Sequence, residues 1–198
     1  MKYLGVTISN DLTWSRHINN ITKSTKCLLW RIHRKFHDAP NHLCLKVYQT
    51  TVLPKLDYCC AVWDPHQVTY RSQLENIQKF TGRIITKNWS LDYPSLCVSL
   101  NLKSLYARRQ IQKLKLCYKI LTSNSCLPSD HFTPHPHPSP WCPNSKQLLI
   151  PYARTSAHKA SYFIDTAKLW NTLPEDIISA PSLDSFKNRL GRFYTSIS

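Results

Sequence analysis

The stretch that decides the fold is SRHINNITKSTKCLLWRIHRKF, which occupies positions 15–36. Apolar side chains recur in it every three or four positions, which is the spacing of one face of an α-helix. The positions on this face are Ile18, Ile21, Thr25, Leu28, Leu29, Ile32 and Phe36. Arg16, Lys23 and Arg34 fall on the opposite face, with Trp30 beside them. The stretch therefore predicts a long amphipathic helix with one apolar face and one basic face.

The same helical periodicity continues along most of the chain. It covers positions 42–52, 56–63, 70–87, 105–121, 162–170 and 182–194, and a short segment runs from position 93 to position 102. Pro54 should kink or break the helical pattern around it, because proline lacks the backbone N–H that a helix interior needs. The helix over 105–121 should bury Ile111, Leu114, Tyr118 and Leu121.

Only the start of the chain has the character of a strand. Positions 2–8 alternate loosely and contain the β-branched residues Val6, Thr7 and Ile8, and a turn is expected at positions 9–11. The chain has only three glycines, so many tight turns and a Gly-rich phosphate loop are not expected. We therefore expect a mainly α fold, a helical bundle with a short N-terminal strand.

A shift in composition divides the chain. Positions 123–146 are rich in proline, histidine and cysteine, and such a stretch cannot hold a helix. The predicted organisation is a bundle over 1–122, a linker over 123–146 and a small helical C-terminal segment over 147–198. Positions 147–153, which begin that segment, are expected to be extended.

The charge balance predicts a polyanionic partner. Lys and Arg number 26 against 11 Asp and Glu, which gives a formal net charge of +15. A surplus this large repels itself in the folded state unless a partner offsets it, and nucleic acid is the usual one. An anionic membrane surface is the rival, but no apolar run is long enough to span a bilayer and no signal peptide is expected.

Two predicted helices carry cations on one face, and we take these as candidate nucleic-acid contacts. Such side chains neutralise successive phosphates, and an aromatic ring among them can stack on a base. The alternative is an ordinary solvated helix face. The candidate residues are Arg16, Lys23, Lys26, Trp30, Arg34, Arg108, Lys115 and Lys119.

The cysteines favour a reducing, intracellular compartment. Eight occur without any Cys-x-x-Cys pair, and several lie within helical patterns, where cysteine acts as a small apolar residue. A zinc site is one interpretation of the Pro-rich stretch, because cysteine and histidine are the usual zinc ligands. The alternative is a biased linker with solvated histidines. The candidate ligands are Cys126, His131, His135, His137 and Cys142.

Catalytic signatures are missing from the sequence. It contains no Gly-x-Ser-x-Gly elbow and no Asp-Asp dipeptide, and two-metal phosphoryl transfer needs clustered carboxylates. Asp57 and Asp64 lie seven residues apart and are expected to be surface charges or caps. The chain alone is therefore expected not to be an enzyme, with no cofactor and no small-molecule substrate.

A series of short phrases occurs in a recognisable order along almost the whole chain. They are KYLGV at 2–6, DLTW at 11–14, HI at 17–18, LDY at 56–58, VWDP at 62–65, LENIQKF at 74–80, LKSLYARR at 102–109, YART at 152–155, WNTLP at 170–174 and PSLDSFK at 181–187. Each phrase alone is weak, but the ordered series resembles the region after the palm in reverse transcriptases of non-LTR retrotransposons, the jockey-like LINE elements.

The resemblance implies an RNA-directed DNA polymerase whose catalytic aspartates lie upstream of this chain. Tyr3, Leu4 and Gly5 are then similar to the primer-grip hairpin, and the helices after them to a thumb that tracks the template–primer duplex. It implies a non-catalytic C-terminal fragment that contacts RNA–DNA hybrid or duplex with little sequence preference, in the nucleus. Two alternatives stay open: an orphan basic RNA- or DNA-binding protein, and an inert relic of a transposable element.

Overall fold

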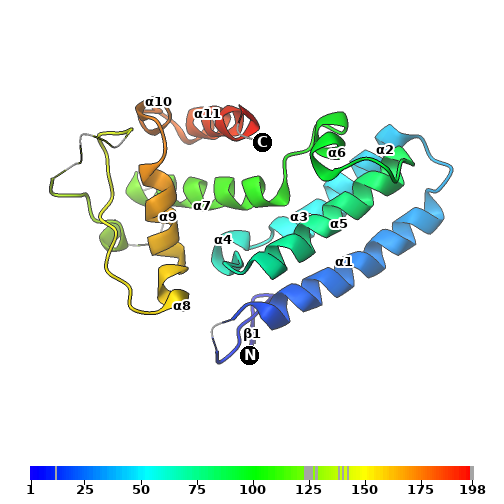
Figure 1. Ribbon diagram of the computed structural model, residues 1–198, viewed down its shortest axis with the longest axis horizontal. Coiled ribbons are helices and arrows are strands. Elements are labelled where there is room, and N and C mark those ends of the chain that lie inside the picture. The colour runs from blue at the N-terminus through cyan, green and yellow to red at the C-terminus, as the bar shows by residue number, and fades with distance from the viewer. Residues whose placement is uncertain are drawn as a thin grey trace. The chain divides into compact units, whose positions relative to one another are not determined.

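The fold is mainly helical, as the sequence predicts (Figure 1). The computed structural model describes residues 1–11, 13–122, 127, 129–137, 139, 141 and 143–196, the last two without their side chains. In these ranges the only sheet is a hairpin of two strands. No described helix is both long enough and apolar enough to cross a membrane.

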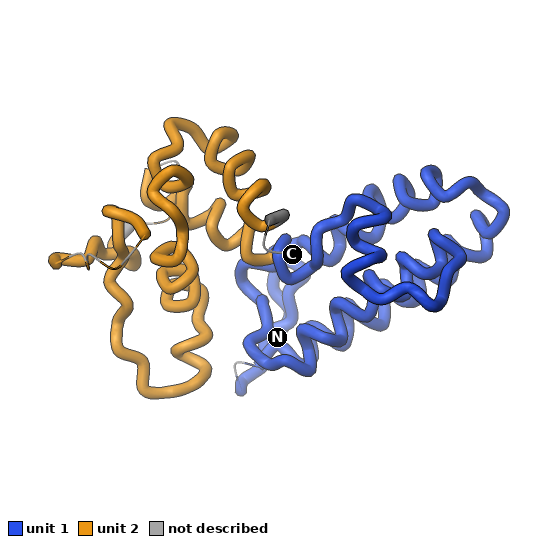
Figure 2. The backbone as a smooth tube through the Cα atoms, turned by 45° about the horizontal axis from the view of Figure 1, so that its top comes forward, with its two compact units in different colours: residues 1–108, 198 blue, residues 109–197 orange. Residues whose placement is uncertain are grey.

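The chain forms two compact units, residues 1–108 and 109–197 (Figure 2). The boundary falls inside α7 (Leu105–Leu121), whereas the composition of the sequence predicts it in the Pro-rich stretch. The difference arises because the described part of that stretch packs within the second unit. Phe132 is buried in the second core, and the backbone N–H of His135 donates to the carbonyl of Gln147 at 2.9 Å. The described residues of the predicted linker are therefore part of a folded unit.

The first unit begins with a hairpin in place of the single predicted strand. Strands β1 (Lys2–Tyr3) and β2 (Val6–Thr7) pair antiparallel, with Lys2 opposite Thr7. Leu4 and Gly5 turn the chain with φ values of 43° and 83°, so both central residues of the turn are left-handed. Such two-residue turns match the twist of the strands they join and strongly favour glycine.

Two long helices frame the first unit, and shorter ones return between them. The elements are α1 (Ser15–Lys35), α2 (Asn41–Val47), η1 (Tyr48–Val52), α3 (Leu53–Asp57), α4 (Cys60–Trp63), α5 (Val68–Thr86) and α6 (Tyr93–Ser99). Helices α1 and α5 lie side by side (Figure 1). The core of the unit lies between these elements and includes Ile18, Leu29, Tyr48, Trp63, Leu74 and Ile77.

Pro54 distorts the chain without breaking it. The preceding segment η1 is a π-helix, in which the N–H of Leu53 bonds to the carbonyl of Tyr48, five residues back. Pro54 then stands in the first turn of α3, where backbone N–H groups have no partner inside the helix. The break comes later, at Cys59, whose φ of 50° is left-handed.

The second unit is built on the C-terminal part of α7. Its other elements are η2 (Ser129–His131), α8 (Ser156–Lys159), α9 (Tyr162–Asn171), α10 (Glu175–Ile178) and α11 (Leu183–Ser196). Tyr118 on α7 stacks on Phe186 of α11 with ring centroids 4.5 Å apart, and its hydroxyl donates to the carbonyl of Ala180 at 2.7 Å. These contacts hold α7 and α11 together.

Amide side chains bind the Pro-rich stretch to the end of α9. The Nδ2 of Asn144 donates to the carbonyls of Trp170, Asn171 and Leu173 at 3.2, 3.3 and 2.9 Å. Asn171 pairs with the backbone of Leu148, whose N–H and C=O both lie within 2.9 Å of the amide. A proline-rich chain offers few backbone donors, so side-chain amides supply the bonds that a helix or sheet would otherwise make.

Candidate nucleic-acid interface

The solvent face of α1 is the most basic surface that the sequence predicted. Ile18 and Leu29 on the other face are buried in the core, which turns the basic side outward. No Asp or Glu occurs between positions 15 and 35. The side chains that the structure exposes on this helix include Arg16, Lys23, Lys26, Arg31, Arg34 and Lys35, which we call the α1 basic face.

The few acids of the chain are mostly engaged elsewhere. Glu75 accepts hydrogen bonds from the Tyr93 hydroxyl and from the backbone N–H of Leu105. The Oδ2 of Asp165 lies 2.7 Å from the Nζ of buried Lys113. Among the described residues, no carboxylate forms an ion pair with Lys23, Lys26, Arg31 or Arg34. Most of the positive charge of the α1 basic face is therefore not offset by an ion pair within the described residues.

At its N-terminal end the α1 basic face meets one carboxylate. Asp11 accepts hydrogen bonds from the backbone N–H and the hydroxyl of Thr13, at 3.1 and 2.8 Å. These bonds, with a smaller contribution from the charge of Arg16, lower the pKa of Asp11. Just after the other end of α1, the Oδ1 of Asp38 lies 3.0 Å from the Nε2 of His37.

Arg108 is a correction to the predicted contact set. Its Nε lies 3.1 and 3.2 Å from the two carboxylate oxygens of Asp57, and the two side chains are only 31% and 16% exposed. Burial alone would lower the pKa of Arg108, but the hydrogen bonds and charge of Asp57 outweigh it and raise the pKa. Asp57 is likewise no free surface charge, and Asp64 is buried.

The two lysines predicted on α7 lie in a crowded setting. Lys115 and Lys119 are both partly buried, and the Nζ of Lys115 lies 3.3 Å from the Oε1 of Gln112. Their neighbour Lys113 is almost fully buried against Asp165. Because α7 packs over much of its circumference, its cations do not form an open face like that of α1.

Three aromatic rings form a row beside the α1 basic face, and only the first, Trp30, is predicted from the sequence as a contact. The ring centroid of Trp30 lies 5.8 Å from that of Phe80 on α5, which lies 6.1 Å from that of Trp89. Trp30 and Trp89 are 53% and 59% exposed. No local signal could have joined Trp30 to the other two rings, because it lies 50 positions before Phe80 and meets it only when α1 packs on α5.

The N-terminal hairpin is anchored at its turn and along β2, although side chains of its first strand and turn are exposed. Tyr3 and Leu4 are exposed. The Tyr58 hydroxyl donates to the carbonyl of Leu4 at 2.9 Å, and the N–H of Thr7 donates to the Nδ1 of His17 at 3.1 Å. These two bonds tie the strands to α1 and to the α3–α4 connection.

The structure describes only part of the predicted zinc site. Cys126 and Cys142 lie outside the described residues. The ring of His131 packs against Phe163 with centroids 4.4 Å apart, and the Nδ1 of His135 accepts from the N–H of His137 at 3.2 Å. In the described part of the chain no three His, Cys, Asp or Glu gather as a metal site would require.

A comparison of the chain with protein-family models, curated proteins and solved structures finds no match. What the residues and their geometry present is a basic helix face with an exposed aromatic row beside it. The cations of such a surface can attract phosphate groups, and its aromatic rings can stack on bases.

Proposed function

We propose that this chain binds nucleic acid through the α1 basic face, as a non-catalytic part of a non-LTR retrotransposon reverse transcriptase that contacts the template–primer. The observation that carries the proposal is a helix of 21 residues whose exposed cations have no acidic residue among them. Cations on one face neutralise successive phosphates and release the counterions condensed on them. Binding of this kind is largely independent of base sequence.

The length of the α1 basic face sets the expected footprint. Arg16 and Arg34 are 18 positions apart, which corresponds to about 27 Å at about 1.5 Å per residue. A duplex rises about 3.4 Å per base pair, so the face spans about eight base pairs. RNA–DNA hybrid and duplex DNA both present phosphates over that distance.

The polymerase context rests on the ordered phrases that resemble the region after the palm of these reverse transcriptases. The predominance of helices supports it, as does an N-terminal hairpin at the phrase that resembles the primer grip. The nuclear location implied by the resemblance belongs to the same proposal. The chain itself has no Asp-Asp dipeptide to supply paired catalytic aspartates.

The test is a salt titration of binding to labelled RNA–DNA hybrid, duplex DNA and single strands. The test variant replaces Arg16, Lys23 and Arg34 with Gln, and the control replaces the exposed Lys159, Lys168 and Lys187 of the second unit. Both variants lose the same net charge.

The first variant should flatten the log–log salt slope by about 3, at about 0.9 per phosphate contact. Its affinity should fall by up to roughly 500-fold at about 0.1 M salt on the same basis. The control should change neither quantity by a comparable amount. Equal losses in the two variants would mean that only total charge matters and that α1 is not the binding surface.

A further inference from the structure

We propose that Trp30, Phe80 and Trp89 form a stacking platform for unpaired bases of a single-stranded nucleic-acid segment. This inference rests on the proposed function, since the α1 basic face would hold the phosphates of the same ligand. Stacking on these rings is a second kind of contact, and it favours bases that are not paired. We call these three residues the aromatic row.

The rings of the aromatic row contact one another without covering one another. The planes of Trp30 and Phe80 are inclined by 55°, and those of Phe80 and Trp89 by 63°. Inclined contacts of this kind fix ring positions without stacking one Trp face on another ring. Because about half of each Trp side chain remains exposed, the row offers aromatic surface to a partner.

The loop that presents Trp89 is held by its own hydrogen bonds. The Oδ1 of Asn88 accepts from the N–H and the hydroxyl of Ser90 at 3.0 and 2.7 Å. On α5, the Nη2 of Arg83 donates to the carbonyl of Leu91 at 3.4 Å. Hydrogen bonds therefore hold the loop on either side of Trp89. Because the loop is already ordered, binding a ligand loses less conformational entropy.

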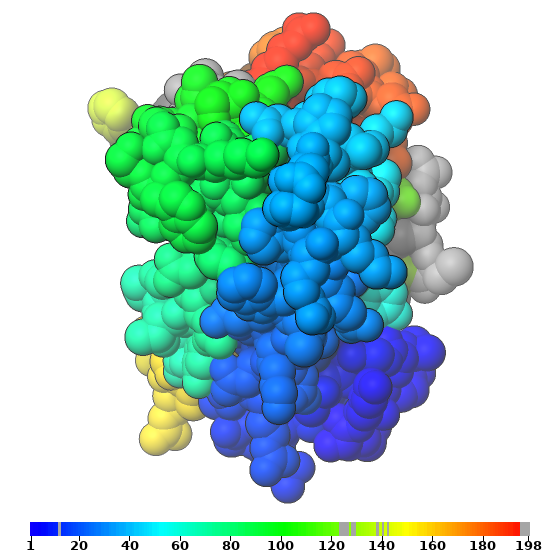
Figure 3. Space-filling view, turned by 90° about the vertical axis from the view of Figure 1, so that its right-hand side faces the viewer, coloured from blue at the N-terminus to red at the C-terminus, as the bar shows by residue number. Residues whose placement is uncertain are grey.

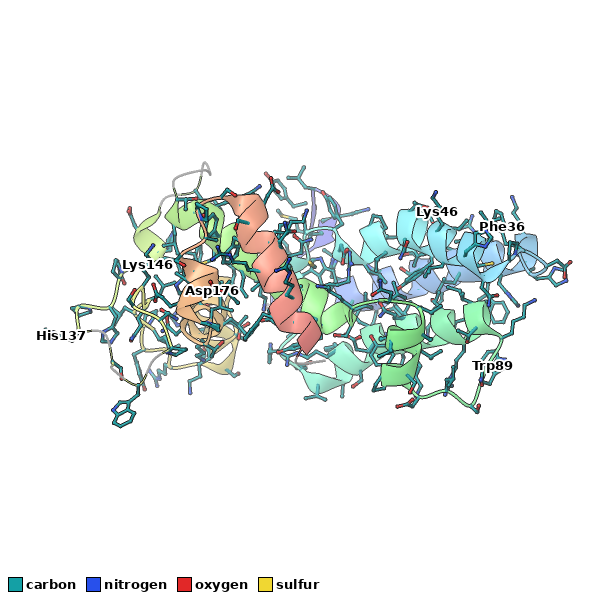
Figure 4. All side chains as sticks on the ribbon, turned by 90° about the horizontal axis from the view of Figure 1, so that it is seen from above. Phe36, Lys46, Trp89, His137, Lys146 and Asp176 are labelled. Carbon is teal, nitrogen blue, oxygen red and sulfur yellow. The ribbon has the colours of Figure 1, made fainter. Side chains whose placement is uncertain are left out.

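The arrangement can be followed at the end of the first unit that contains the C-terminus of α1. Figure 4 places Trp89 at the end of the unit where Phe36 follows α1. Figure 3 views the molecule from that end, and the light-blue surface of α1 and α2 adjoins the green surface around α6. The aromatic row crosses between these two segments, from α1 to the loop before α6.

The charge around the aromatic row suits a nucleic acid better than an apolar partner. Lys26 and Arg34 stand four positions before and after Trp30 on α1, so they flank its ring. Positions 76–91, which contain Phe80 and Trp89, include three Lys or Arg and no acid. Alternating rings and cations are the pattern by which proteins hold single strands, with bases on the rings and phosphates on the cations.

An unpaired base is the ligand that this chemistry selects. In a duplex both faces of an interior base are covered by its neighbours in the stack, so an aromatic side chain reaches such a face only where the stack ends. A single strand, or a single-stranded extension beside a hybrid or duplex, exposes its base faces. We infer that the chain prefers a duplex with a single-stranded overhang to a blunt duplex of the same length.

The experiment measures binding of the full chain to three labelled oligonucleotides: a single strand, a blunt hybrid and the same hybrid with an overhang. The variants are Trp89→Ala, the conservative Trp89→Phe and, as matched control, Trp141→Ala. Trp141 is 94% exposed in the second unit and takes no part in the aromatic row. Trp89 is itself largely solvent-exposed, so its removal should leave the fold intact.

The expected result is a loss of single-strand and overhang affinity for Trp89→Ala between roughly 5-fold and 150-fold, the range for one base–aromatic stack. Blunt-hybrid affinity and the salt slope should stay unchanged, Trp89→Phe should retain most of the binding, and Trp141→Ala all of it. Equal losses on blunt and overhang ligands would overturn the platform while leaving the α1 basic face standing. If Trp89→Ala instead abolishes a self-association seen by sedimentation and leaves single-strand binding intact, the aromatic row is a contact between copies. No binding of any ligand by the unmodified chain would overturn both proposals.

Discussion

Asn144 gives the sharpest test of how the second unit is held together. It is only 4% exposed, and its Nδ2 faces three carbonyl oxygens at 2.9–3.3 Å, at the end of α9 and just beyond it. The amide nitrogen carries two hydrogens, so two donors serve three acceptors. Replacing Asn144 by Ala removes both donors. The carbonyl of Trp170 still accepts from the N–H of Leu173, but the carbonyls of Asn171 and Leu173 lose the donor that Asn144 supplies.

The cost follows from the burial of these groups. A buried acceptor left unsatisfied loses about 1–3 kcal/mol, and two donors are lost, so we expect Asn144→Ala to destabilise by about 3 kcal/mol. At about 3 °C per kcal/mol for a chain of this size, the melting temperature should fall by roughly 9 °C. Asn144→Asp should cost more than Ala, because it places a carboxylate against carbonyl oxygens in a buried site.

The assay is urea unfolding followed by circular dichroism and Trp fluorescence. The matched control is Asn188→Ala, an exposed asparagine on α11 of the same unit, which should change stability by less than about 0.5 kcal/mol. An Asn144→Ala variant as stable as this control would refute the reasoning, and so would an Asp variant milder than the Ala variant. Either result would mean that the Pro-rich stretch is held by something other than its amides.

Two further predictions concern the first unit. Asp57→Asn leaves the half-buried Arg108 without its carboxylate and should lower the free energy of unfolding in urea by about 2–3 kcal/mol. The exposed control Asp184→Asn should leave it almost unchanged. Equal effects of the two variants would mean that the ion pair contributes no stability. Burial lowers the pKa of His17, so below its ordinary value of about 6.5 the unfolded chain binds more protons than the folded one. Stability should therefore fall as the pH drops through 6.5, because a protonated ring can no longer accept the N–H of Thr7, and His17→Gln should remove that part of the pH dependence; an unchanged profile would assign it to other groups.

The primary sequence by itself determined where the long helices lie and which face of α1 is buried. The helix predicted at positions 105–121 has those bounds in the structure, and the one predicted at positions 15–36 ends within a residue of its prediction. Arg16, Lys23 and Arg34 are exposed on the side of α1 away from the core, as the helical spacing predicts. These features follow from the 3.6-residue repeat of apolar positions, which can be recognised within the segment that forms the helix.

Packing decided the features that join distant segments. Arg108 was expected on an open basic face, but Asp57, 51 positions away, takes it as an ion-pair partner. The Pro-rich stretch was expected to be a linker because its composition excludes a helix, yet Asn144 binds it to the end of α9 and the residue that follows.

The aromatic row is the plainest example of the same limit. Trp30 could be recognised as a candidate contact because it lies beside the basic face of its own helix. Nothing in the segments around Phe80 and Trp89 indicates that these rings lie next to Trp30. The three rings meet because α1 packs along α5 and the loop after α5 turns back. Local periodicity shows which face of a helix is buried, but only the packing of one helix on another decides which side chains become neighbours.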